Sequence, residues 1–139
     1  DQFVLSFCLL SISYMKGAMH ARLVDSAGNG YGLTLAMASD SSREHDWRNA
    51  IVRWDAGRAE ETVLVRGEGD RARIALHPTG VLHEMQFRFA RGRLSLWCDD
   101  EELLHVRDAS YDAFTQLSFS VEYQTRFTID DIKLATVVE

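Results

Sequence analysis

Long hydrophobic runs are absent from this sequence of 139 residues. No apolar segment approaches the roughly 20 residues that a helix needs to cross a bilayer, so we expect no membrane span. Positive charge is scarce as well, because the net charge is −6 and only two of the 15 basic residues are lysines. Nucleic-acid binding depends on a basic stripe that neutralises phosphates, and this charge balance argues against such a partner.

Cysteine is nearly absent too. Cys8 and Cys98 are the only two, which is too few for a disulfide framework. Cys8 falls in the phase opposite to its apolar neighbours Leu5 and Phe7, whereas Cys98 shares the phase of Leu96. One side chain is therefore expected to point outward and the other inward, and we predict two free thiols.

The segment 3–13 is apolar enough to be compared with the core of a secretion signal, but it lacks the flanks of one. No basic region precedes it, and no small-residue cleavage site follows at the right place. Its apolar residues alternate instead, which predicts a strand. The length fits one domain over residues 1–139. Because the chain opens on Asp1 inside this strand pattern, we expect the domain to be processed or excised from a longer protein.

The abundant feature is alternation of apolar and polar residues with a period of two, interrupted by short turn clusters. The clearest turn, 25–30, contains Asn-Gly and predicts a hairpin. About eleven short strands are expected, including a pair at 62–66 and 71–76, which indicates an all-β sandwich or barrel. Helical turns are expected only at 40–47 and 108–114.

Three segments carry a family resemblance: the opening strand at 1–7, the hairpin at 82–99 and the closing strand at 127–134. Together they resemble the concanavalin A-like lectin/glucanase superfamily, particularly its laminin G-like bacterial jelly-roll domains. The hairpin departs from the family pattern, because its turn at 99–101 is acidic and lacks the usual glycine. The resemblance implies a two-sheet antiparallel jelly-roll sandwich and an extracellular or cell-surface location, with sugar binding common. It does not imply catalysis, since this fold hosts many functions.

Glycoside hydrolysis needs two carboxyl groups that face each other across a cleft, roughly 5–5.5 Å apart or wider. The acidic residues at 60–61, 99–102 and 130–131 are adjacent rather than alternating, so neighbours point to opposite faces. No zinc-ligand spacing, nucleophile elbow or cysteine signature is present. We therefore favour a non-enzymatic function. The enzymatic alternative is a sugar hydrolase-like domain with acids from separate strands, namely Glu84, Glu122 and Asp131.

Asp130 and Asp131 in the closing strand are the candidate metal ligands. In some jelly-roll binding modules an Asp of the last strand helps to bind a structural calcium. The resemblance therefore implies Asp130 or Asp131 as calcium ligands, together with Asp1 or Asp25. The alternative is that one Asp caps a loop and the other forms a bulge, because the apolar phase shifts across them. No other cofactor is expected.

Sugar binding needs an aromatic platform with planar polar groups around it. Trp97 has the outward phase of the hairpin at 82–99, where its outward neighbours supply an amide, a guanidinium and a hydroxyl. These neighbours are Gln86, Arg88 and Ser95. The candidates for extending the same surface are Trp54 and Arg53, or Trp47 in the polar loop. The alternative is that Trp97 is covered, with Arg88 stacked on it.

The sequence therefore predicts a non-catalytic, extracellular module that binds carbohydrate or another surface ligand near Trp97. A structural, adhesion or self-assembly domain of a surface protein, which contacts neighbouring domains or copies of itself, is the alternative from a different class. The hydrolase-like enzyme is the second alternative. The ligand itself is not encoded in any motif of the chain.

Overall fold

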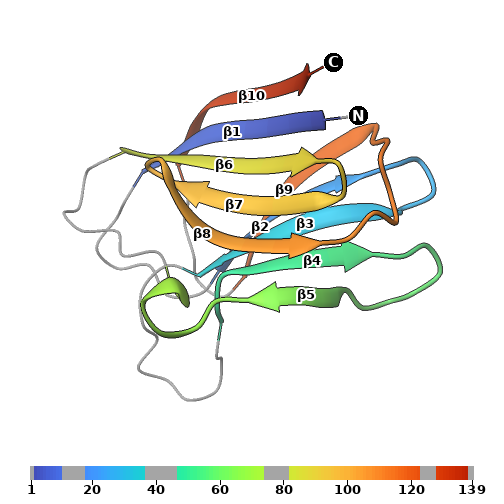
Figure 1. The fold of residues 1–139 in the computed structure, drawn as a ribbon, viewed down its shortest axis with the longest axis horizontal. Helices are drawn as coiled ribbons and strands as arrows, with labels where there is room; N and C mark the ends of the chain where they lie inside the picture. The colour runs from blue at the N-terminus through green and yellow to red at the C-terminus, as the bar shows by residue number, and fades with distance from the viewer. Residues whose placement is uncertain (1, 11–17, 37–46, 74–81, 123–127, 138–139) are drawn as a thin grey trace.

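Ten strands pair into two antiparallel sheets in the computed structural model, which describes residues 2–10, 18–36, 47–73, 82–122 and 128–137 (Figure 1). Sheet A consists, in spatial order, of β10 (Ile129–Val137), β1 (Gln2–Leu10), β6 (Leu82–Ala90), β7 (Arg93–Cys98) and β8 (Glu101–Arg107). Sheet B consists of β5 (Thr62–Arg66), β4 (Ala50–Trp54), β3 (Gly30–Ala36), β2 (Ala18–Val24) and β9 (Gln116–Glu122). The predicted two-sheet antiparallel jelly-roll sandwich is confirmed.

The core lies between the two sheets and follows the alternation of the sequence. In β1, Phe3, Leu5, Phe7 and Leu9 are each at most 5% exposed, and the residues between them face outward. The Phe7 ring lies 5.5 Å from the Phe119 ring of β9, so this contact joins the two sheets. Burying each such side chain contributes about 1.5–3 kcal/mol, which fixes the inward face of every central strand.

Strand β3 is buried on both of its faces. Its inward residues Tyr31, Leu33 and Leu35 fill the core, while its outward positions carry small residues such as Gly30 and Gly32. Small outward residues at the centre of a sheet leave room for side chains of the two flanking strands to pack above them. This property of β3 shapes the outer face of sheet B.

The closing strand shifts register against β1. Ser6 pairs with Lys133, whereas Cys8 pairs with Asp130, and Asp131 between these pairs has a φ of 55°. One extra residue on β10 therefore opposes β1, which is a β-bulge. The predicted phase shift at this position is confirmed.

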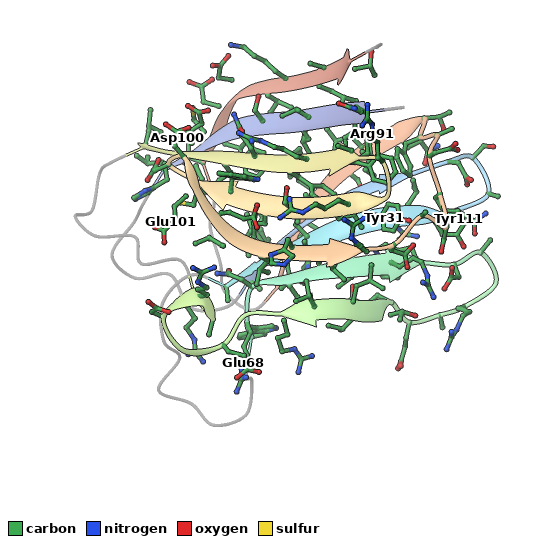
Figure 2. The ribbon with its side chains drawn as sticks, viewed as in Figure 1. Tyr31, Glu68, Arg91, Asp100, Glu101 and Tyr111 are labelled. Carbon is green, nitrogen blue, oxygen red and sulfur yellow. The ribbon has the colours of Figure 1, made fainter. Side chains whose placement is uncertain are left out.

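The turns at the two ends of β7 both adopt left-handed backbone conformations, and Figure 2 shows their labelled residues Arg91 and Asp100 at opposite ends of the strand. In the acidic turn, Asp99 and Asp100 have φ values of 48° and 68° without any glycine. Two-residue hairpin turns of this type normally take Asn-Gly or Asp-Gly. The Asp99 carboxylate stabilises the turn by accepting a 2.9 Å hydrogen bond from the Glu84 amide.

The strand predicted at 71–76 is wrong at its start, because Gly69–Arg71 forms a 3₁₀ turn. Buried Asn49 holds this segment: its amide Nδ2 donates to the Arg71 carbonyl and its backbone N–H donates to the Ala72 carbonyl. These bonds turn the chain away from strand pairing. Residues 74–76 lie outside the described part of the chain.

The helical turn predicted at 108–114 is also wrong. The segment is irregular, and the Asp108 carboxylate accepts hydrogen bonds from the Ser110 amide and the Tyr31 hydroxyl instead of starting a helix. Residues 40–46 lie outside the described part. No helix among the described residues is long and apolar enough to cross a membrane.

Candidate functional site

The outer face of sheet B carries a groove of about 760 Å³, within the range of about 300–1,000 Å³ that small-molecule sites occupy. All five strands of the sheet line it. Its polar and aromatic lining includes His20 and Arg22 of β2, Thr34 of β3, Trp54 of β4 and Ser118 of β9. None of these residues except Trp54 was among the predicted site residues.

The groove exists because β3 has a glycine, and so no side chain, where it lies between β2 and β4. Gly32 is paired with Arg22 on one side and with Val52 on the other. A Cβ atom at Gly32 would lie 2.7 Å from the Ala21 carbonyl oxygen and 3.4 Å from the Trp54 Nε1. Glycine therefore keeps the floor of the groove low and lets side chains from β2 and β4 meet above it.

Arg22 and Trp54 meet across this floor. The guanidinium carbon of Arg22 lies 4.0 Å from the centroid of the Trp54 ring, which is a cation–π contact. The Arg22 Nε is buried and has no hydrogen-bond acceptor within the described part of the chain. The groove thus contains a positioned guanidinium with an unsatisfied donor.

Further polar groups surround this pair. His20 Nδ1 lies 3.1 Å from the Thr34 hydroxyl, and Ser120 of β9 is paired with His20 in the ladder. The rim carries charge of both signs, since Arg48, Arg66, Glu60 and Glu61 also line the groove. Hydroxyl, imidazole and charged groups therefore line one groove together with apolar side chains, a composition found in small-molecule sites.

A smaller hollow of about 300 Å³ continues the groove and shares Arg22 and Ser118 with it. Gln116 and the β2–β3 turn form its other walls. In that turn the Asn29 amide lowers the pKa of Asp25, and the Ala27 amide acts in the same direction against the effect of burial. The carboxylate oxygen Oδ1 of Asp25 is therefore engaged with the turn backbone.

The predicted surface around Trp97 is assembled on the outer face of sheet A. Trp97 Nε1 donates a 2.9 Å hydrogen bond to Ser95 Oγ, and the Arg88 guanidinium carbon lies 4.1 Å from the Trp97 ring centroid. Arg88 Nε in turn donates to Gln86 Oε1 at 2.8 Å. The four residues lie together, as the sequence indicates. Their polar groups hydrogen-bond to one another, and Arg88 stacks on Trp97 as the alternative prediction had it.

The prediction that Trp54 and Arg53 extend the Trp97 surface is wrong. Both residues belong to β4 in sheet B, on the other side of the sandwich from the outward face of β7. Trp54 lines the groove, while Arg53 pairs with Asp55 at 3.2 Å and with Asp108 at 2.6 Å. Alternation within each strand could not show which sheet the strand joins.

Arg53 belongs to a network that fixes the β8–β9 connection onto sheet B, at the end of the sandwich where Figure 2 labels Tyr31 and Tyr111. Burial opposes ionisation of Asp108, but hydrogen bonds from Tyr31, Ser110 and Arg53 outweigh it and lower the pKa of Asp108 to about 2. Burial, together with the bond to Asp108, raises the pKa of Tyr31 far above its usual value. This network has a structural role.

His83, Cys98 and Asp99 form a cluster that the sequence spacing did not indicate, with one donor atom from each within 4.8 Å of the others. His83 Nδ1 lies 2.6 Å from Asp99 Oδ2, and Cys98 Sγ lies 3.8 Å from the same oxygen. Burial and the Asp99 charge raise the pKa of Cys98 to about 12, so the thiol is protonated and a poor nucleophile. Both cysteines are free, as predicted.

The candidate calcium ligands Asp130 and Asp131 are exposed at the β10 bulge. Asp130 Oδ1 accepts a hydrogen bond from the Asp131 amide, and Asp131 lies 3.3 Å from the Lys133 ammonium. Figure 1 places the turn that contains Asp25 at the opposite end of the sandwich from the start of β10. Asp25 therefore does not join them, Asp1 lies outside the described residues, and calcium binding remains a prediction.

The three acids of the hydrolase alternative do not share one sheet. Glu84 lies on β6 and Asp131 on β10 in sheet A, whereas Glu122 lies on β9 in sheet B. The Glu84 carboxylate accepts a hydrogen bond from Gln86 on the outer face of sheet A. The proposed trio therefore comes from both sheets, and the enzymatic alternative stays a prediction.

Comparison with known proteins places the fold. No family model matches the chain, and no curated protein matches its sequence. The carbohydrate-binding module CBM66 from Bacillus subtilis is similar in structure, with a TM-score of 0.66 and 13% identity over 98% of this chain and 76% of that one. The fold is a lectin-like jelly roll.

Two galectins are similar to this chain in structure to about the same degree. The galectin LEC-6 from Caenorhabditis elegans has a TM-score of 0.64 and 9% identity, over 98% of this chain and 84% of that chain. A tetrameric galectin from the ball sponge Cinachyrella sp. has a TM-score of 0.66 and 10% identity, over 95% and 89%. At these identities the comparison shows a shared fold, and the narrower laminin G-like assignment stays a prediction.

Proposed function

We propose that this domain is a non-catalytic binding module, carried by an extracellular or cell-surface protein, that takes carbohydrate in the groove of sheet B. The observation that carries the proposal is the Arg22–Trp54 pair above Gly32, in which the buried Arg22 Nε has no acceptor within residues 2–10, 18–36, 47–73, 82–122 and 128–137. The structural likeness to a carbohydrate-binding module and to galectins supports it.

The chemistry of the groove suits a sugar. The side chains of Val52 and Val63, and the part of the Trp54 indole that Arg22 does not cover, provide apolar surface for ring C–H groups. The Arg22 guanidinium and the Ser118 hydroxyl are donors and acceptors for sugar hydroxyls. A ligand acceptor would reach Arg22 through the part of its guanidinium that lines the groove, because the Nε atom itself is buried.

The Trp97 surface is a weaker candidate for the same function, although it also contains an Arg–Trp pair. Arg88 already donates to Gln86, and Trp97 already donates to Ser95. A ligand would have to break these bonds before it could form its own. The groove of sheet B therefore offers more binding free energy than the predicted Trp97 surface.

Binding to an immobilised panel of oligosaccharides tests the proposal, and the two Arg–Trp pairs provide a matched control. Trp54→Ala is expected to weaken binding of any retained glycan by at least about tenfold, since it removes apolar contact and the support of Arg22. Trp97→Ala is expected to leave the affinity within about twofold. If Trp97→Ala weakens binding more than Trp54→Ala, the site lies on sheet A. If no glycan of the panel binds, the proposed function is wrong.

Assembly with a neighbouring domain or a second copy is the second candidate. The edge strands β9 and β10 expose large apolar side chains, with Val121 at 50%, Ile132 at 50% and Leu134 at 51% exposure. Exposed edges of this kind pair readily with other chains. Sedimentation over a concentration series tests it: a monomer at every concentration would exclude self-assembly, and an Ile132→Lys variant is expected to dissociate any dimer formed through β10.

A further inference from the structure

We infer that Arg22 binds a carboxylate or sulfate group of an acidic saccharide, at the junction between the two hollows on sheet B. The inference rests on the proposed function and adds the chemical class of the ligand. Three observations lead to it: the state of the Arg22 donors, the way Trp54 holds the guanidinium, and the position of Arg22 between the hollows.

Arg22 differs from the other arginines that are partly buried. Arg53 pairs with two carboxylates, Arg93 lies 2.8 Å from the Glu102 carboxylate, and Arg88 donates to an amide oxygen. Arg22 has no acidic partner among the described residues, and its Nε is buried without an acceptor. A guanidinium is a planar fork of donors that matches the two oxygens of a carboxylate or sulfate, and such charged bonds are about twice as strong as neutral ones.

Because Arg22 stacks on Trp54, the arrangement favours an anion bound by the guanidinium over a sugar ring stacked on the indole. Arg22 covers one face of the indole at 4.0 Å, so that face is not free for a sugar ring. In exchange, the indole fixes the plane of the guanidinium before the ligand arrives. A donor group that is already oriented loses less conformational entropy on binding, so the contact yields more affinity.

The local charge is compatible with an anion even though the whole chain carries −6. Three arginines and three acids line the two hollows, namely Arg22, Arg48 and Arg66 with Glu60, Glu61 and Asp25, and Asp25 Oδ1 already accepts hydrogen bonds from its own turn. Arg48 is in part compensated, since it lies 3.6 Å from Glu68 outside the groove lining. Arg22 therefore provides a positive charge that has no acidic partner among the described residues, at the junction of the two hollows.

The position of Arg22 indicates where the anion lies along the ligand. Arg22 and Ser118 line both the 760 Å³ groove and the 300 Å³ hollow. A saccharide whose acidic residue contacts Arg22 can therefore extend into both hollows. This geometry suits an internal unit of a chain better than a chain end.

The experiment compares three linear tetrasaccharides of matched linkage by titration calorimetry: one of uronic acids, its carboxyl-reduced neutral counterpart, and a sulfated counterpart. We expect at least one acidic ligand to bind about tenfold or more tightly than the neutral one. Arg22→Gln is expected to remove this preference, and Arg22→Lys to retain part of it, because lysine keeps the charge but loses the fork. Arg88→Gln is the matched control and should keep the full preference.

The outcomes separate the inference from the function beneath it. Neutral and acidic ligands that bind equally, with Trp54→Ala still weakening both, would overturn the inference and leave the proposed function standing. A preference that survives Arg22→Gln but is lost in Arg88→Gln would place the anion on sheet A and also overturn it. Absence of binding to all three ligands and to the wider panel would reject both. Circular dichroism of each variant verifies that it is folded.

Discussion

The hydroxyl of Tyr31 donates a 2.6 Å hydrogen bond to the carboxylate Oδ1 of Asp108. Tyr31 is fully buried in β3, and Asp108 begins the connection between β8 of sheet A and β9 of sheet B. The same carboxylate binds Arg53, which directly precedes Trp54 in β4. One ionised side chain thus links the core, the sheet-to-sheet connection and the strand that presents the groove tryptophan.

This link predicts a loss of stability in acid. The folded pKa of Asp108 is about 2, below its ordinary 3.8, so its carboxylate stabilises the fold at pH values above 3.8. That contribution, about 2 kcal/mol, is lost as the pH falls from about 4 through 2. Urea unfolding of wild type and Asp108→Asn at pH 6 and pH 2.5 measures it, and the difference between the two proteins should shrink at the lower pH.

The exposed Asp112 on the same connection provides the control. Asp112→Asn should show the pH dependence of the wild type, because its side chain is exposed. If Asp108→Asn instead kept the same stability difference from the wild type at both pH values, Asp108 would not be the group that titrates.

Glycine substitutions in β3 should destabilise the fold in a defined order. A Cβ at Gly30 would lie 2.1 Å from the Leu23 carbonyl oxygen, and a Cβ at Gly32 would lie 2.7 Å from the Ala21 carbonyl oxygen. Overpacking against backbone costs about 1–3 kcal/mol or more. Chemical denaturation should therefore rank wild type above Gly32→Ala and Gly32→Ala above Gly30→Ala. Equal midpoints for all three would contradict the close packing of β3 against β2.

Asn49 should be among the costliest polar residues to remove. Its side chain is fully buried, accepts a 3.0 Å hydrogen bond from the Ala36 amide and donates one of 3.0 Å to the Arg71 carbonyl. Asn49→Ala leaves both backbone groups without their partner, at a cost of about 2–4 kcal/mol in unfolding free energy. Asn29→Ala is the control, because its bond to the Ala56 amide is exposed and should cost less than about 1 kcal/mol.

The two thiols should differ in how they react. Burial first, and then the Asp99 charge, raises the pKa of Cys98 from 9.0 to about 12. Three pKa units leave about a thousandth of the usual thiolate at a given pH, so alkylation of Cys98 should slow by about that factor. Iodoacetamide labelling of the single-cysteine variants Cys8→Ser and Cys98→Ser at pH 8, followed by mass spectrometry, measures both rates.

Cys98 should become fully reactive only after denaturation in urea. Cys8 lies on the outward side of β1, and its pKa is raised by burial and by the charge of Asp131. We therefore expect its labelling in the folded protein to be slow but measurable. Rapid labelling of Cys98 in the folded state would show that the end of β7 opens.

Much of the fold could be predicted because it depends on neighbouring residues. Alternation in β1 and β6 identified the inward faces, and the phase shift at Asp130 and Asp131 identified the bulge. The errors arose where distant groups intervened. Asn49 replaced a strand at 71–76 by a 3₁₀ turn, and Tyr31 held the segment at 108–114 in an irregular conformation.

The candidate site was predicted only in part, for a similar reason. The sequence correctly grouped Trp97 with Arg88, because both lie on one local hairpin. It named Trp54 only as an extension of the Trp97 surface and did not single out Arg22, because alternation within a strand does not say which sheet that strand joins. The sequence therefore could not show that Trp54 lies on sheet B and Trp97 on sheet A.

By itself, then, the sequence determined an all-β sandwich or barrel with its inward faces and its clearest turns, because side-chain alternation and turn chemistry act over a few residues. Only the tertiary structure decided which face has an unsatisfied recognition group. The two Arg–Trp pairs have nearly equal distances, 4.0 Å and 4.1 Å, yet Arg88 has an acceptor and Arg22 Nε has none among the described residues. That difference depends on β2, β3, β4 and β9 lying side by side, an order set by burial of the whole core.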